Sequence, residues 1–275
     1  MPELPEVEIT RRGLLTLQGK TVKNVVIRNA SMRWPVPAHL PQTLKNQQLV
    51  ALTRRAKYIL AEFQNDKLEK GTLLLHLGMS GRISLLDRNY PPEKHDHFDI
   101  AFNSGEVLRL RDPRRFGAVL WAGLEPNNHP LLRVLGPEPL GEDFNGKYLH
   151  QHICARSAAI KTTIMDGHLV VGVGNIYASE SLFRARINPQ TPAKNITLKQ
   201  CEKLVVEIKA TLSDALAAGG SSLRDFFGTD GNPGYFQQEY FVYGRTNEPC
   251  KICTKPIKTI RLGQRSTFFC AHCQK

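Results

Sequence analysis

Four cysteines near the C-terminal end of the sequence have the spacing of a metal site. Cys250 and Cys253 are separated by two residues, as are Cys270 and Cys273, and sixteen residues lie between the two pairs. Two such pairs offer four thiolates to one tetrahedral ion, and this spacing is typical of a zinc ribbon. Because four protein ligands leave no open position for water or substrate, we predict one structural Zn²⁺ ion.

Positive charge is concentrated around these cysteines. Residues 245–275 contain seven basic residues and one acidic residue, and the whole chain has a net charge of +12 and a pI of about 9.5. Such a charge indicates a polyanionic partner. We predict that the ribbon holds a basic hairpin, including Arg265, in a shape that grips phosphate. A ribbon that only stabilises the fold is the alternative.

The amino terminus offers a second chemical group. Removal of Met1 leaves Pro2 with a secondary amine, and a helix that begins just after it disfavours the ammonium form. Attack of that amine on a sugar carbon gives an iminium ion, which is an electron sink for later elimination. The neighbouring Glu3 can carry protons. Taken alone, Pro-Glu at this place also fits the ordinary start of a helix.

Two kinds of element must position these groups. A helix is expected over residues 2–17, with Pro5 in its first turn and Glu6 and Glu8 near its positive end. The rest of the first half is rich in β-forming residues. We expect strands over residues 22–27, 49–53, 58–63, 73–77, 98–102 and 107–110, the last two joined as a hairpin.

The second half has a different pattern. Turn-forming residues at 130–140 mark a domain boundary, and helical periodicity follows, most clearly over 198–218 before Gly219-Gly220. Residues 221–238 mix glycine, proline and aromatic residues, which favours a structured loop.

Composition excludes several classes of protein. With 275 residues, 41% of them hydrophobic, and a mean hydropathy of −0.30, the chain has enough material for about two folded domains. Its apolar runs are too short to span a bilayer, so we expect no membrane partner. Charged residues occupy the first thirty positions where a secretory peptide needs an apolar core, which favours the cytosol. We expect Cys154 and Cys201, outside the metal pattern, to be buried thiols.

Seven stretches of sequence resemble bacterial formamidopyrimidine-DNA glycosylases, enzymes that excise oxidised purines such as 8-oxoguanine. The resemblance covers nearly the whole chain and departs from the family pattern at Ile9, beyond the catalytic opening. The matching stretches are Pro2-Glu3-Leu4-Pro5-Glu6-Val7-Glu8, Arg54-Arg55-Ala56-Lys57-Tyr58, His76-Leu77-Gly78-Met79-Ser80-Gly81, Lys94-His95-Asp96-His97, Asp112-Pro113-Arg114-Arg115-Phe116-Gly117, Gly172-Val173-Gly174-Asn175-Ile176-Tyr177-Ala178-Ser179-Glu180 and the cysteine ribbon.

The resemblance implies roles for the catalytic residues. Pro2 would be the Schiff-base nucleophile at deoxyribose C1′, and Glu3 the acid that assists opening of the sugar ring. Lys57, in a strand-like segment, would donate a proton in β-elimination, although a phosphate-binding lysine is the alternative. Arg265 would grip phosphate, a role that suits a guanidinium better than proton donation in δ-elimination.

The resemblance also implies the contacts with DNA. An enzyme that acts on a base within a duplex must expel that base and fill the gap. Met79, Arg114 and Phe116 resemble the family's filling group, although from pattern alone Met79 and Phe116 would be core residues of strands. His95 and Arg156 are carried over as further contacts with DNA.

Gly172-x-Gly174-Asn175 lacks the third glycine of a dinucleotide-binding loop and fits a turn between helices. The resemblance makes it a helix–two-turn–helix in which Lys161 and Asn175 contact phosphate. A helical connection capped by Asn175 is the plainer interpretation. The loop at 221–238 would sense the lesion.

These inferences define an α+β multidomain protein. We expect an N-terminal β-sandwich with a capping helix at 1–133, a helical DNA-binding domain at 134–244 and a zinc finger at 245–275. The predicted partner is damaged double-stranded DNA, bound by a monomer in the bacterial cytoplasm at the nucleoid, with no redox or nucleotide cofactor.

The predicted reaction is cleavage of the N-glycosidic bond of an oxidised purine, followed by β,δ-elimination. One rival is an endonuclease VIII-like glycosylase for oxidised pyrimidines, which has the same nucleophile and ribbon; the set Met79, Arg114 and Phe116 favours the purine enzyme. A non-enzymatic zinc-ribbon DNA-binding protein is the other rival, and it leaves the match at Pro2, Glu3 and Lys57 unexplained.

Overall fold

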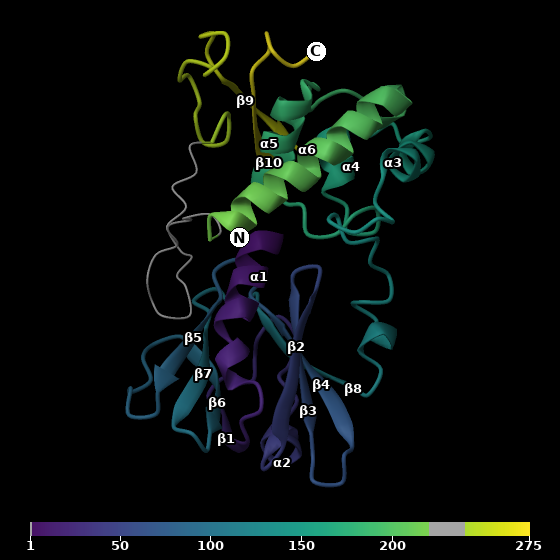
Figure 1. Ribbon diagram of the computed structural model, residues 1–275. Helices are drawn as coiled ribbons and strands as arrows, with labels where there is room; N and C mark the ends of the chain where they lie inside the picture. Colours follow the sequence, from purple (N-terminus) through teal and green to yellow (C-terminus); the bar gives the residue numbers. More distant parts are fainter. Residues whose placement is uncertain (1, 220–239) are drawn as a thin grey trace. The chain divides into compact units, whose positions relative to one another are not determined.

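The computed structural model describes residues 2–219 and 240–275 (Figure 1). The described chain forms two compact units. The first contains the described residues up to Arg133 together with Ala218 and Gly219, and the second contains Val134–Ala217 and resumes at Tyr240. The loop expected at 221–238 lies outside the described residues. Within them, no helix combines the length and the apolar character that crossing a membrane requires.

The first unit begins with helix α1 (Leu4–Gly13), followed by a short 3-10 helix, η1 (Leu15–Leu17). The first turn is closed by a capping box, in which the side chains of Glu3 and Glu6 each accept the other residue's backbone N–H. Pro5 lies within the first turn, where its missing N–H costs no hydrogen bond. The helix is therefore shorter than the predicted 2–17: it begins at Leu4, after the N-cap residue Glu3, and ends at Gly13.

Two antiparallel four-stranded sheets make up the rest of this unit, with a short helix α2 (Leu40–Leu44) between the first two strands. The first sheet has the order β2 (Gln48–Arg55), β3 (Tyr58–Gln64), β4 (Lys70–His76) and β8 (Ala118–Gly123). The second has the order β1 (Val22–Ile27), β6 (Asp96–Phe102), β7 (Glu106–Arg111) and β5 (Arg82–Asp87).

The inner faces of both sheets contribute to one hydrophobic core. Leu73 and Leu75 of β4 and Phe98 and Ile100 of β6 belong to the same buried cluster, together with Val7 of α1. Because successive side chains of a strand point to opposite faces, Leu73 and Leu75, like Phe98 and Ile100, share the face that lines this core. The predicted β-sandwich with a capping helix is confirmed, and every predicted strand is present.

The second unit is mainly helical. Its longest helix, α6, matches the predicted span, and both α3 and α5 pack against it. α3 and α6 each bury one apolar face, as expected of amphipathic helices, whereas α5 is buried on nearly all sides. The helices are α3 (Gly146–Ile153), α4 (Ile160–Ile164), α5 (Asn175–Ala185) and α6 (Leu198–Ala217), with 3-10 turns η2 (Pro126–Asn128), in the first unit, and η3 (Ala193–Asn195).

A two-stranded hairpin, β9 (Lys258–Leu262) and β10 (Arg265–Phe269), completes the second unit. Gly263 and Gln264 turn the chain with φ of 50° and 61°, the left-handed geometry that matches the twist of a two-residue hairpin. A small apolar cluster around Phe183, Val242 and Ile257 lies beside this hairpin and includes Cys250 and Cys270. The limits of the three predicted domains remain predictions.

One prediction about the cysteines is wrong. Cys201 on α6 is buried as expected, but Cys154 is exposed. Cys154 follows the last residue of α3, where the helix ends at the surface, and its thiol donates to the carbonyl of Gln151 at 3.2 Å. A local hydrogen bond thus replaces the expected burial.

Candidate functional site

The start of α1 fixes the two residues expected to carry the chemistry. Glu3 is the N-cap residue and is only 2% exposed, and its carboxylate accepts the backbone N–H of Glu6. In return, the backbone N–H of Glu3 donates to Glu6 Oε2 at 2.8 Å. Pro2 directly precedes this cap. A helix N-terminus favours negative charge on Glu3 and disfavours positive charge on the amine of Pro2.

Helix α1 is tied to the first sheet by ion pairs. Glu8 Oε2 lies 3.3 Å from Arg54 Nε on β2, and Arg11 Nη1 donates to the carbonyl of Leu52 at 2.9 Å. Burial disfavours ionisation of Glu8, but hydrogen bonds from Arg11 and Arg12 and the charge of Arg54 outweigh it and lower its pKa. These contacts hold the helix that carries Pro2 against the strand that leads to Lys57.

Lys57 lies at the tip of the hairpin between β2 and β3, not in a strand as predicted. Ala56 and Lys57 form the two-residue turn, and Ala56 has a φ of 55°. This left-handed conformation is unfavourable for a residue with a Cβ, and Arg54 Nη1 supports it by donating to the carbonyl of Ala56 at 2.9 Å. At this tip Lys57 is half-buried, close enough for its charge to act on His76.

His76, which the sequence analysis gave no role, lies close to Lys57. Its ring centroid is 4.7 Å from that of Tyr58, and its Nδ1 accepts the backbone N–H of Gly78 at 3.0 Å. Burial, followed by the positive charges of Lys57 and Arg33, lowers the pKa of His76 to about 4. The ring is therefore neutral at pH 7, and it orients the turn after β4. His76 is the first residue of the matching stretch 76–81, which could have marked it as a functional candidate, but the sequence does not show that its ring is buried and neutral.

Asp112 holds together the two turns that carry Met79, Arg114 and Phe116. This carboxylate is fully buried. Its Oδ1 accepts the hydroxyl of Ser80 at 2.8 Å and the backbone N–H of Arg114 at 3.3 Å, and its Oδ2 accepts the N–H of Gly117 at 2.7 Å. One buried acid thus fixes both turns, a role that the sequence analysis did not assign to it.

The two turns also touch directly through Gly78. A Cβ on Gly78 would lie 2.3 Å from the carbonyl carbon of Phe116 and 2.4 Å from the nitrogen of Gly117, and Gly78 has a φ of 63°. Only glycine allows both the conformation and the close approach. Gly78 therefore brings the turn that carries Met79 against the one that carries Phe116.

The expected filling group is at least partly exposed, as a role in binding requires. Phe116 is 44% exposed, Met79 is half-buried, and the Arg114 guanidinium lies 4.9 Å from the centroid of the Phe116 ring. The plainer interpretation of Met79 and Phe116 as core residues of strands is wrong, because both lie in turns. An exposed phenylalanine stacked with an arginine can insert between bases and hydrogen-bond to them.

In the second unit, Lys161 joins three segments. It is 1% exposed, and its ammonium donates to Asn175 Oδ1 at 2.6 Å, Thr267 Oγ1 at 2.8 Å and the carbonyl of Ser266 at 3.1 Å. Asn175 Nδ2 donates to that same carbonyl at 3.0 Å. These bonds connect α4, the first residue of α5 and strand β10. Lys161 therefore fixes Asn175 against the hairpin, and Asn175 is not a simple helix cap.

The two remaining basic candidates differ in setting. Arg265 is exposed at the start of β10, directly before Ser266. Arg156 forms an ion pair with Asp166 at 2.8 Å. Burial raises the pKa of Asp166, but the His168 backbone N–H and Arg156 outweigh this effect and lower it. The structure thus brings Lys161, Asn175 and the Arg265 segment together and leaves Arg156 in a separate ion pair.

A further buried acid anchors the segment that leads into the ribbon. Glu180 on α5 accepts the backbone N–H groups of Phe241, Val242 and Tyr243 at 2.8–3.0 Å. Its burial raises its pKa, and these three hydrogen bonds oppose the rise. Glu180 was quoted only as part of a motif, and its anchoring role depends on contacts more than sixty residues away.

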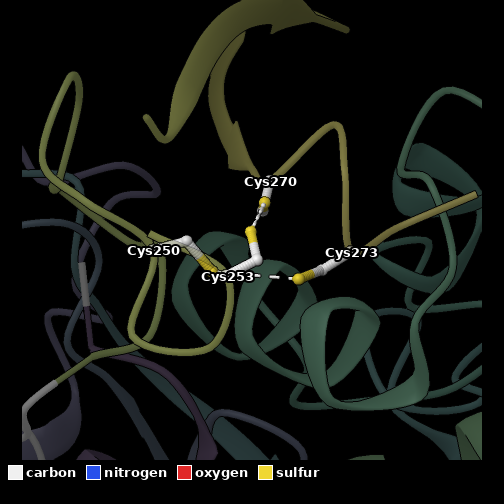
Figure 2. A group of neighbouring side chains, drawn as sticks. All are labelled: Cys250, Cys253, Cys270 and Cys273. Carbon is white, nitrogen blue, oxygen red and sulfur yellow. Dashed lines mark hydrogen bonds between the residues drawn. The ribbon is translucent and has the colours of Figure 1, made fainter. Parts of the chain in front are cut away.

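The four cysteines form a cluster that fits zinc. Figure 2 shows their sulfur atoms pointing toward one another, and all four Sγ atoms lie within 4.8 Å of one another. The separations of Cys253 from Cys270 and of Cys250 from Cys273 are 3.4 Å and 3.9 Å. Sulfur atoms about 2.3 Å from a tetrahedral zinc ion would lie about 3.8 Å apart. The donor set and its size thus fit one structural Zn²⁺.

The second unit combines helices α4 and α5, the basic β9–β10 hairpin and a four-cysteine cluster that fits zinc. This combination is typical of a zinc-finger protein that binds nucleic acid. Comparison with family models gives the particular family. Residues 1–119 match the formamidopyrimidine-DNA glycosylase N-terminal domain, residues 135–227 match its H2TH (helix–two-turn–helix) domain, and residues 247–275 match a zinc finger found in FPG and IleRS.

Individual proteins agree with these family models. The formamidopyrimidine-DNA glycosylase of Methylobacillus flagellatus is 66% identical over 275 residues, which cover 100% of this chain and 97% of that protein. The Lactococcus lactis Fpg bound to DNA with an abasic site superimposes with a TM-score of 0.91 at 32% identity, over 99% of both chains. The same enzyme bound to N7-benzyl-Fapy-dG DNA gives a TM-score of 0.90 over 100% of both chains, at 32% identity.

The chain therefore belongs to the formamidopyrimidine-DNA glycosylase family. It is a DNA repair glycosylase with one structural zinc site. The predicted family, fold and zinc site are confirmed.

Proposed function

We propose that the protein excises oxidised purines, 8-oxoguanine and formamidopyrimidines, from duplex DNA and then cleaves the resulting abasic site. The observation that carries this proposal is the start of α1, where a capped, buried Glu3 follows the proline whose amine would attack. The related Fpg of Lactococcus lactis forms complexes with DNA that contains an abasic site and with DNA that contains N7-benzyl-Fapy-dG, which supports the same substrates for this chain.

The proposed first step is displacement of the base. The amine of Pro2 forms a bond to deoxyribose C1′ as the bond between C1′ and the base nitrogen breaks, and water supplies the proton with which the base leaves. The Glu3 carboxylate takes the proton that the substituted amine loses and, now a carboxylic acid, gives it to the ring oxygen O4′ as the bond between C1′ and O4′ opens, which leaves an iminium ion on Pro2.

The iminium ion then accepts electrons in two eliminations. Water takes a proton from C2′ as the bond from C3′ to oxygen breaks, and in the second elimination it takes a proton from C4′ as the bond from C5′ to oxygen breaks. Water finally hydrolyses the imine. Each elimination releases a phosphate, so the product is a one-nucleotide gap with phosphate ends. Lys57 serves as proton donor in the first elimination, and Arg265 grips phosphate.

The remaining residues bind the DNA. Met79, Arg114 and Phe116 fill the space left by the expelled base, and Arg114 hydrogen-bonds to the orphaned cytosine. The backbone phosphates are bound by His95, Arg156, Lys161 and Asn175. Lys161 acts indirectly: its ammonium already has three protein acceptors, and it holds Asn175 and β10 in the position that binds phosphate.

The partner is damaged double-stranded DNA, and the protein acts as a monomer at the bacterial nucleoid. A four-thiolate metal site together with two further free cysteines fits the reducing cytoplasm. Sedimentation of the protein with and without a lesion duplex checks this: a mass of one chain per duplex is expected, and two chains would contradict it.

Borohydride trapping tests the reaction. Wild-type protein with an 8-oxoguanine:cytosine duplex should give a covalent adduct whose peptide maps to Pro2, and Pro2→Gly, with its primary amine, should trap far less. Protein that retains Met1 is the matched control, because its proline nitrogen is blocked. Preferential trapping on an oxidised-pyrimidine duplex would instead indicate endonuclease VIII-like specificity. Intact binding without any adduct would refute the proposal and leave a DNA-binding protein.

A further inference from the structure

His97 is a buried histidine that takes no part in the proposed reaction. It is 7% exposed, and its Nε2 lies 2.9 Å from the backbone carbonyl oxygen of Asp112. A carbonyl oxygen can only accept a hydrogen bond, so Nε2 carries the hydrogen and His97 is the donor. This side chain therefore bonds to the residue whose carboxylate holds the two turns of the filling group.

The pairing of β6 with β7 contains a β-bulge at His97. From Asp96 to Phe98, β6 advances by two residues while its partner strand advances by one, so His97 is the extra residue. A bulge of this kind re-aims a side chain, and bulges are frequent next to active sites. Strand β7 ends at Arg111, directly before Asp112. The bulge thus directs His97 toward the residue that follows the neighbouring strand.

Two ion pairs hold this bulge in register. Asp96 accepts from Arg111 Nε at 2.7 Å. Asp99 accepts from Arg109 Nε and Nη2 at 3.0 and 2.9 Å. The two arginines are two positions apart on β7 and so share one face of the sheet. The two aspartates are three positions apart on β6, and they reach that same face because one extra residue lies between them. The ion pairs therefore fix the place of the bulge and the direction of its side chain.

Asp112 is held by this stretch of β6 at both of its backbone polar groups. Its N–H donates to the carbonyl of His95 at 3.0 Å, and its carbonyl accepts from His97. The same carbonyl accepts the N–H of Arg115 at 3.2 Å, which closes the turn that carries Arg114. His97 therefore fixes the backbone from which the Asp112 carboxylate reaches both turns.

We propose that His97 is a positioning residue for expulsion of the damaged base. Its Nε2–H holds the Asp112 carbonyl, and through it the turn that presents Arg114 and Phe116 to the space that the base leaves. His97 neither contacts the DNA nor moves a proton. This inference rests on the proposed function in so far as Arg114 and Phe116 fill that space, and it places the effect of His97 before the attack by Pro2.

The test compares His97→Gln with His97→Met. The two side chains have similar length, but only glutamine has an Nε2–H that can donate to the Asp112 carbonyl. Both variants lose the edge-to-face contact with His95, at 6.2 Å between ring centroids, so their difference isolates the hydrogen bond. On an 8-oxoguanine:cytosine duplex, borohydride trapping should be about 5-fold slower in His97→Met than in His97→Gln. His39→Met, at an exposed position of the same unit, is the matched control.

Two further readouts separate positioning from a general loss of stability. On a duplex with a preformed abasic site no base has to be expelled, so the two variants should trap at rates within about 2-fold of each other. A 2-aminopurine base beside the lesion becomes more fluorescent as the stack opens, which requires no covalent step. That rise should be slower in His97→Met by the same factor as trapping. All rates are measured below the melting temperature of the less stable variant.

Three outcomes would overturn the proposal. Equal trapping by the two variants on the lesion duplex would show that the hydrogen bond has no effect. An equal difference between them on the lesion and abasic duplexes would indicate a structural role only. An equal 2-aminopurine rise in both would place His97 outside the expulsion step. If the wild type gives no adduct on either duplex, the glycosylase mechanism fails, while the 2-aminopurine comparison still decides the role of His97.

Discussion

The molecule presents its two groups of DNA-binding candidates by different physical means. In the first unit, Met79, Arg114 and Phe116 lie on turns that depend on one buried carboxylate, Asp112. In the second unit, the Arg265 hairpin is held by the ammonium of Lys161 and lies beside the four-cysteine centre. The first arrangement leaves the side chains exposed on short turns. The second fixes a backbone surface through a metal and a buried cation.

The difference suits the two tasks. Filling the space of an expelled base needs side chains that can change rotamer, so anchoring only the backbone of the turns is sufficient. Gripping phosphate needs donors held in a fixed geometry, and rigid placement reduces the entropy lost on binding. Variants of the anchoring groups should therefore affect damaged and undamaged DNA differently.

Loss of zinc should have the largest effect. Cys253→Ser should abolish zinc binding and unfold the hairpin, because the small apolar cluster there cannot replace about 10 kcal/mol or more of apparent metal-binding free energy. Binding of damaged and undamaged duplexes should fall by about 100-fold or more. Zinc content and electrophoretic titrations measure both effects. Cys154→Ser, an exposed cysteine outside the centre, is the control, and full affinity in a zinc-free Cys253→Ser protein would contradict the prediction.

Removal of the buried ammonium should come next. Lys161→Met fills the same space but leaves the acceptors on Asn175, Ser266 and Thr267 without it. Hydrogen bonds to charged groups contribute about 1.5–3 kcal/mol each, partly offset here by the desolvation of the cation, so we expect a net loss of about 2–4 kcal/mol. Urea unfolding measures the loss.

The same variant separates the two anchoring modes. Affinity for damaged and undamaged DNA should fall together, by about 10-fold, while zinc stays bound. Lys203→Met on the exposed face of α6 removes the same charge without these contacts and is the control. A loss confined to damaged DNA would show that the Lys161 contacts do not hold the phosphate-binding surface.

Asp112 tests the other side of the comparison. In Asp112→Asn, one carboxylate oxygen becomes an amide NH₂ that faces the backbone N–H of either Gly117 or Arg114. A donor against a buried donor costs about 1–3 kcal/mol. We expect borohydride trapping on the lesion duplex to slow about 10-fold and binding of undamaged duplex to change little. Ser80→Ala removes one of the two hydrogen bonds that Asp112 Oδ1 accepts and should slow trapping by a smaller factor. If either variant lost as much affinity for undamaged duplex, Asp112 would not act on the lesion-specific turns alone.

Features encoded by local spacing were predictable from the sequence. The zinc cysteines, helix α6 and six of the eight strands of the sandwich follow from residues close together in the chain. Strands β5 and β8 were not predicted: Leu86 interrupts the alternation of Ile83 and Leu85 with polar neighbours, and Ala118–Gly123 contains no polar residue to alternate. The turn position of Lys57 was also missed, since Ala56 gives no sign in the sequence of its left-handed conformation.

Long-range contacts account for what the sequence could not show about the site. Asp112 reaches Ser80 across 32 positions, and Lys161 reaches Thr267 across 106. No periodicity reports such pairs, so the acid that fixes the turns and the burial of the lysine became apparent only in the folded chain. The family resemblance supplied candidate residues but not the contacts that hold them.

The smallest effect concerns pH and His76. Its pKa is lowered to about 4 from an ordinary value of 6.5, with burial as the main cause. The unfolded chain therefore binds a proton at a higher pH than the folded one. This residue contributes stability above pH 6.5 that is progressively lost as the pH falls toward 4, below which its contribution no longer changes.

Thermal unfolding of wild-type protein and His76→Gln between pH 7.5 and 4 measures this effect. The glutamine side chain offers an acceptor for the Gly78 N–H but does not titrate, so the melting temperature of the variant should fall less over the interval from pH 6.5 to 4. His76 adjoins Lys57 and the turn that carries Met79. The rate of borohydride trapping on lesion DNA should therefore fall more steeply in the wild type than in the variant as the pH is lowered. Parallel pH profiles in both assays would show that the turn is oriented by Asp112 alone, which would sharpen the contrast between the two ways in which this protein fixes its DNA-binding groups.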